Sequence, residues 1–170
     1  MLDDWARIEL AIRLRTINRV LDRIVPEFPD EAAEEAIQIM LKTVARGEMA
    51  QAAMVLENVI QANPFWLRGY LLLATIYEDA QKVERAITIM EKGLAMCVTG
   101  FRLFRAREWV KTVNRINGPI VHTRIRSNAE RLRRYERMFH HRLAMLRIHC
   151  GCFDEALDHW SAIEDEHCAS

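Results

Sequence analysis

The chain has 170 residues, 51% of them hydrophobic, and its 24 basic residues balance 24 acidic ones. This is the composition of a soluble globular domain with a sizeable core, and it argues against a loop-rich β fold or a small disulfide scaffold. Because Gly and Pro are few and strong helix formers dominate, we expect a single all-α domain over residues 1–170. The apolar runs are too short to cross a bilayer, and the N-terminus lacks the pattern of a secretory signal. We therefore expect a cytoplasmic protein that binds no membrane.

The first predicted helix covers residues 3–25. An aspartate at its start can cap it, and Pro26 and Pro29 end it. Apolar residues recur every three or four positions and form one seam: Leu10, Leu14, Ile17, Leu21 and Ile24. A seam of this kind has to be buried. We expect it to pack on the next helices of a monomer, and the alternative is a homodimer formed through this helix.

Two helical hairpins are predicted next, over residues 31–64 and 65–98. Gly47 has the place of a helix-ending glycine in the first of them. Small and bulky positions of the first hairpin return 34 residues later in the second: Ala52 as Ala86, and Leu56 as Met90. Repetition at a fixed period of this length is typical of arrays of stacked helical hairpins.

This repeat resembles that of the tetratricopeptide repeat (TPR) family, whose period is 34 residues. The family's first-helix pattern of aromatic, Leu, small and aromatic residues is matched by Tyr70, Leu73, Ala74 and Tyr77. Its second-helix pattern is matched by Ala86, Met90 and Gly93. The segment Gly151–Trp160 gives a third match, within a unit predicted over residues 137–168. Four positions depart from the pattern: Met40, Val59, Gln81 and Ile163. The resemblance implies a degenerate α-solenoid.

Residues 99–136 do not fit the repeat and are predicted to be a basic two-helix insertion. Residues 99–137 hold 11 basic and three acidic residues, whereas the segments on both sides are acidic. Its first helix is expected over about 101–116. Ser127 and Glu130 form a capping box, so the second helix is expected to begin there and to run to about His149.

In the TPR family, the first helix of each repeat lines a concave groove that binds other proteins. The resemblance therefore implies these partner-binding residues: Glu34, Ile37, Leu41, Arg68, Leu71, Thr75, Glu78, His141 and Arg142. About half of these residues are apolar, and such a lining suits an amphipathic helix or an extended segment of a partner. The alternative occupant is the chain's own N-terminal helix. The predicted function is that of a non-enzymatic adaptor, scaffold or chaperone for another protein, similar in architecture to small bacterial TPR chaperones of secretion systems.

The basic segment suggests an alternative function, the binding of RNA or DNA. Arginine suits bidentate contact with phosphate. The arginines concerned are Arg102, Arg105, Arg124, Arg126, Arg131, Arg133, Arg134 and Arg137. The other interpretation is a solvated helix face whose arginines pair with nearby acids.

Neither a catalytic motif nor a phosphate-binding loop is present, so we expect neither enzymatic activity nor a cofactor. The segment His149–Cys152 contains metal-binding residue types, but structural zinc sites use wider, paired spacings, so no metal is expected. Without a secretion signal, the four cysteines are predicted to be free thiols.

Overall fold

A computed structural model describes residues 4–24, 31–113 and 119–168, with side chains for 4–23, 31–103 and 129–164. Over these residues the chain is helical and has no strand, which confirms the all-α prediction. The helices are α1 (Asp4–Ile24), α2 (Glu31–Ala45), α3 (Met49–Ala62), α4 (Leu67–Asp79), α5 (Val83–Val113), α6 (Pro119–His149) and α7 (Phe153–Cys168). None of them, within these ranges, combines the length and apolarity that a membrane crossing requires.

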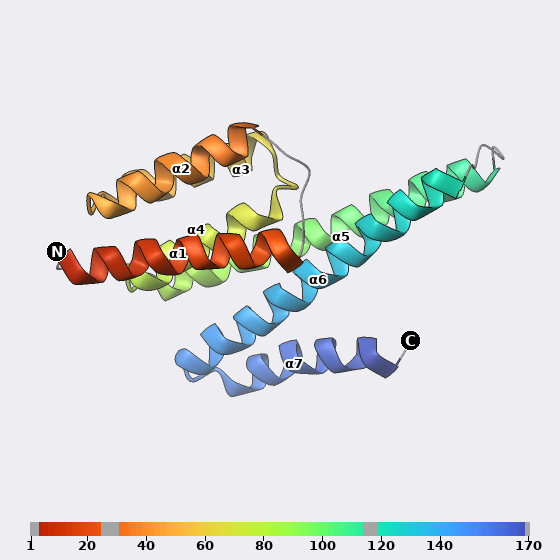
Figure 1. Cartoon of the computed structure of the whole chain (residues 1–170). Coiled ribbons are helices and arrows are strands. Elements are labelled where there is room, and N and C mark those ends of the chain that lie inside the picture. Colours follow the sequence, from red (N-terminus) through yellow and green to blue (C-terminus); the bar gives the residue numbers. More distant parts are fainter. Residues whose placement is uncertain (1–3, 25–30, 114–118, 169–170) are drawn as a thin grey trace.

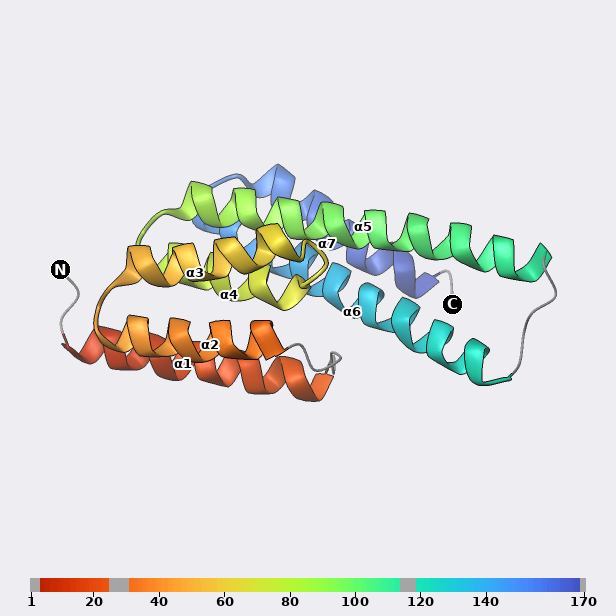
Figure 2. The ribbon, with the colours of Figure 1, turned by 90° about the horizontal axis from the view of Figure 1, so that it is seen from above.

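The helices after α1 pair into three hairpins, α2–α3, α4–α5 and α6–α7 (Figure 1). Successive hairpins also touch, because α3 packs on α4 and α5 packs on α6. α5 and α6 have 31 residues each. Their far halves run beyond the other helices as a two-helix arm (Figures 1 and 2).

One turn geometry closes all three hairpins. The backbone is left-handed in each turn, with φ of 80° at Gly47, 56° at Gln81 and 76° at Gly151. In each case the next residue donates its N–H to a carbonyl five residues back, as Lys82 does to Tyr77 at 2.8 Å. Glycine adopts this conformation without steric cost. Gln81 adopts it at a cost, because its Cβ atom comes too close to the following carbonyl oxygen.

Small residues let the helices approach closely. Ala52, Ala86 and Ala156 are the fourth residues of the second helices of the three hairpins and are almost fully buried, with exposed fractions of 0%, 0% and 2%. A Cβ atom on Gly93 of α5 would lie 2.5 Å from the ring of Phe139 on α6. That ring also meets the Tyr70 ring edge-on, at 6.5 Å between centroids. The three hairpins therefore share one continuous core.

Two observed helix bounds differ from the predicted ones. α5 continues unbroken past residue 98 because no proline interrupts it between Val83 and Val113. α6 begins at Pro119 and not at Ser127, since proline is favoured in the first turn of a helix. Residues 99–113 and 119–136 are thus continuous with the second and third hairpins, and the predicted end at residue 116 lies outside the described residues. The division into TPR-like units remains a prediction.

Candidate binding groove

α1 lies along the first helices of the first two hairpins, α2 and α4 (Figure 1). The seam predicted from the sequence faces these helices, and Leu10, Leu14 and Leu21 are at most 3% exposed. Ile17 is half-buried against the same core, and the side chain of Ile24 lies outside the described residues. α1 therefore occupies the face on which the partner-binding groove was predicted. The oligomeric state stays a prediction.

Most of the predicted groove residues of α2 and α4 are buried, although Glu34 is exposed. Ile37 and Leu41 on α2 are 0% and 6% exposed, and Leu71 and Thr75 on α4 are 8% and 2% exposed. Figure 2 shows α1 and α2 side by side. This part of the groove has an amphipathic helix in place, and that helix is part of the same chain.

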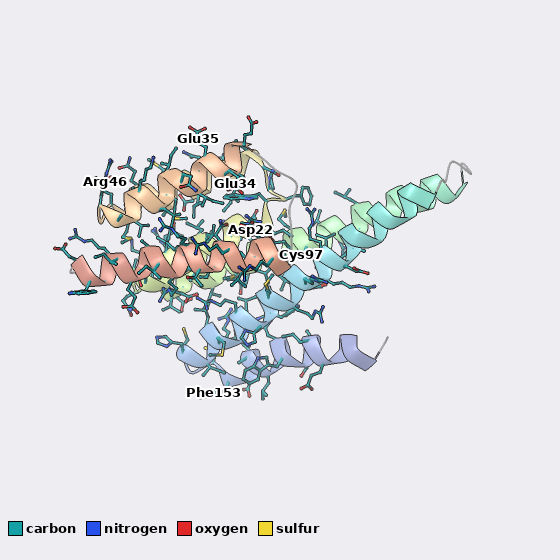
Figure 3. The ribbon with its side chains drawn as sticks, viewed as in Figure 1. Asp22, Glu34, Glu35, Arg46, Cys97 and Phe153 are labelled. Atoms are coloured by element: carbon teal, nitrogen blue, oxygen red, sulfur yellow. The ribbon has the colours of Figure 1, made fainter. Side chains whose placement is uncertain are left out.

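Polar contacts fix α1 at both ends of α4. Arg68, in the first turn of α4, is only 2% exposed. Its Nη1 atom lies 2.5 Å from Asp22 Oδ1 and donates to Asn18 Oδ1 at 3.2 Å, and both partners belong to α1. Glu34 Oε1 of α2 is 3.6 Å from the same nitrogen; Asp22 and Glu34 are labelled on their neighbouring helices in Figure 3. At the other end, Arg13 of α1 donates to Asp79 at 3.3 Å.

Beside α1 the inner surface is open. A cavity of about 490 Å³ lies between α1, α4 and α6, with one residue each from α5 and α7. Apolar side chains dominate its lining, among them Ile17, Val20, Leu71, Met138 and Ile163. This volume is in the range of pockets that hold a small ligand or a few side chains of a partner.

Basic groups line the α6 side of this cavity. They are Arg137, His141 and Arg142. Arg142 is neutralised by a bidentate ion pair with Glu78 of α4, at 2.9 Å and 2.6 Å. Among the described residues, Arg137 and His141 take part in no ion pair. The cavity is therefore apolar within, and its basic side can accept an acidic group.

The structure brings some of the predicted groove residues together and separates others. Leu71, Thr75, His141 and Arg142 share the cavity, whereas Glu34, Ile37, Leu41 and Arg68 lie under or beside α1. The sequence prediction missed the α1 and α7 contributions, Thr16, Ile17, Val20, Leu21 and Ile163. Ile17 and Leu21 belong to the predicted seam, but a second role for them depends on where α6 lies, which no local pattern reveals.

The arginines of the predicted nucleic-acid site lie along α5 and α6. Arg102, Arg133 and Arg134 are exposed, and Arg131 and Arg137 are half-buried. The side chains of Arg105, Arg124 and Arg126 lie outside the described residues. RNA or DNA binding remains an untested alternative.

Burial shifts the pKa values of a cysteine and a histidine, Cys97 and His159. Burial, with a smaller contribution from Glu136, raises the pKa of Cys97 to about 12, so this thiol stays protonated and unreactive. The Nδ1 atoms of His140 and His159 are 3.0 Å apart, so one ring donates its Nδ1 proton to the other. Burial first, and then the charge of Arg147, lowers the pKa of His159. Within the described ranges, no three His, Cys, Asp or Glu residues are grouped as metal ligands would be.

No family model, curated protein or solved structure matches the chain. The geometry of the groove and the sequence pattern of the hairpins are thus the basis on which function is inferred.

Proposed function

We propose that this chain is a non-enzymatic, TPR-like interaction module, an adaptor, scaffold or chaperone that binds an amphipathic segment of a partner protein in the cavity beside α1. The observation that carries the proposal is the open apolar cavity of about 490 Å³ on the inner surface of stacked hairpins. Surfaces of this shape bind helical or extended segments through regularly spaced apolar anchors.

α1 indicates the chemistry that this inner surface accepts. It presents leucines to α2 and α4, and its Asp22 meets the buried Arg68. The partner segment is expected to follow the same rule in the cavity. Apolar side chains would contact Leu71 and Met138, and an acidic group would lie near Arg137 and His141.

A pair of matched substitutions tests the site. Val20 lines the cavity and is 44% exposed, so Val20→Trp fills the cavity from its rim without disturbing the core. Ile39→Trp on α2 is the control, because Ile39 is 41% exposed and lies away from the cavity. Helical peptides selected from a display library against the unmodified protein should bind Val20→Trp at least about tenfold more weakly, or about 1.4 kcal/mol, by fluorescence anisotropy.

The same peptides test the charge of the cavity. Arg137→Glu should weaken acidic peptides, whereas Arg133→Glu, an exposed residue one turn away and outside the cavity, should leave them unchanged. Peptides that bind equally to the unmodified protein and to Val20→Trp would contradict the proposed site. The nucleic-acid alternative would be favoured if the protein bound single-stranded RNA tightly, if this binding weakened steeply with salt, and if Val20→Trp left it unchanged.

A further inference from the structure

Two exposed apolar stripes lie at the two ends of the folded chain, apart from the cavity. The α1 stripe consists of Trp5, Ile8 and Ile12, which are 80%, 50% and 59% exposed. The α7 stripe consists of Phe153, Leu157 and Trp160, which are 63%, 57% and 37% exposed. Helices at the ends of hairpin arrays normally show water a polar outer face. Both end helices of this chain instead present large apolar side chains.

The charges around the two stripes are opposite in sign. α7 contains six acidic residues and neither Lys nor Arg, and Asp154, Asp158 and Glu164 are exposed beside its stripe. α1 is net basic, and Arg15, Arg19 and Arg23 are exposed on the face that continues its stripe. Two acidic residues, Asp4 and Glu9, adjoin that stripe in sequence. The α1 stripe is therefore followed by positive charge, and the α7 stripe is surrounded by negative charge.

We propose that the α1 stripe of one copy of the protein packs against the α7 stripe of a second copy. The two stripes have the same length, since seven residues separate Trp5 from Ile12 and Phe153 from Trp160. When the two helices run parallel, apolar residues oppose apolar residues. This register places Trp160 opposite Ile12. Glu164, four residues after Trp160, then lies opposite the basic stretch that begins at Arg15.

Like charges disfavour the symmetric pairings. Two α7 stripes brought together would oppose acidic residues, and two α1 stripes brought together in parallel would oppose arginines, both of which are unfavourable. Within a single copy the stripes cannot meet, because α1 packs on α2 and α4 while α7 packs on α6 (Figure 1). Phe153 lies at the lower edge of the molecule in Figure 3, away from α1. The contact is thus between different faces of two copies.

Complementation between two variants tests this arrangement with the full chain. One variant, Ile8→Ser/Ile12→Ser, removes the α1 stripe, and the other, Phe153→Ser/Leu157→Ser, removes the α7 stripe. Met54→Ser is the control, since Met54 is 53% exposed on α3 and lies in neither stripe. Circular dichroism first confirms that each variant keeps its helix content and melting temperature. Sedimentation velocity then gives the mass of each protein over a range of concentrations.

The unmodified protein and Met54→Ser should exceed the 19.9 kDa of one chain as concentration rises. Each stripe variant alone should associate at least about tenfold more weakly. Their equimolar mixture should form pairs, because each variant supplies the face that the other lacks. A monomeric unmodified protein would overturn the proposal, as would a mixture that does not associate. Association that only one of the two variants abolishes would show a symmetric contact and would overturn it as well.

Discussion

α1 packs on α2 and α4, the first helices of the first two hairpins, whereas α6, the first helix of the third hairpin, keeps exposed residues on the corresponding face. Matching positions on these first helices show the contrast directly: Ile37, Leu41, Leu71 and Thr75 are at most 8% exposed, while His141 is exposed and Met145 is 49% exposed. α1 covers the first two hairpins and leaves the third uncovered. Burial on this face is thus decided by the extra helix and not by the repeat itself. The half beneath α1 contributes stability, and the half beside the cavity is where we propose that a partner binds.

The largest expected effect separates a buried leucine of α1 from an exposed leucine of the third hairpin. Leu14 of α1 is 0% exposed, and Leu157 of α7 is 57% exposed. Leu14→Ala should lower the free energy of unfolding by about 2–5 kcal/mol, because it leaves a cavity under α1. Leu157→Ala should change it by less than about 0.5 kcal/mol. Urea unfolding of dilute protein measures both, and equal losses would show that α1 does not pack on α2 and α4.

The contact between Asp22 and Arg68 should contribute less to the free energy of unfolding than the buried leucines of α1. Asp22→Ala removes the closest acidic partner of the buried Arg68 and should cost about 1–3 kcal/mol, as the loss of a hydrogen bond to a charged group does. Asp158→Ala, on the exposed face of α7, is the matched control and should stay within about 0.5 kcal/mol. If chemical denaturation finds the two variants alike, the Arg68 contact does not hold α1 in place.

Substitutions in the three hairpin turns should change the free energy of unfolding by about 1 kcal/mol. Gln81→Gly should stabilise the protein by about 0.5–1 kcal/mol, since relief of left-handed strain exceeds the entropy that glycine adds to the unfolded chain. Gly47→Ala should cost more than Gly151→Ala. A Cβ atom on Gly47 would lie 2.7 Å from Arg7 Nε of α1, whereas one on Gly151 meets nothing within 4 Å. Thermal unfolding ranks the three, and a destabilised Gln81→Gly would contradict the shared turn geometry.

The smallest expected effect is a pH dependence in the third hairpin. The pKa of His159 is lowered in the folded protein. In the unfolded state this histidine has its ordinary pKa of about 6.5, so the folded state binds fewer protons at this site. Its contribution to stability is retained above that pH and is lost as the pH falls below it. The urea midpoint should therefore drop between pH 7.5 and 5.5, and by less in His159→Gln. An identical drop in both proteins would place the titrating group elsewhere.

Much of the helical framework was predictable, because its signals are local. The leucine seam of α1 and the turn glycines Gly47 and Gly151 are all visible as short patterns in the sequence. The continuity of α5 was missed because the end of a repeat was expected at residue 98, although no proline or capping signal marks it. The cavity was not predictable, since it joins Val20 of α1 to Ile163 of α7. These two residues are far apart in sequence, and only the packing of their helices brings them together.

The length of α6 sets a fixed span across the molecule. Pro119 begins the helix at the tip of the arm, and Arg137, which borders the cavity, comes 18 positions later in the same unbroken helix. At 1.5 Å per residue this is about 27 Å. Anything attached at the tip would lie about that far along α6 from a segment in the cavity, on an arm of two paired helices. The molecule can thus work as a spacer that sets the distance between two bound objects.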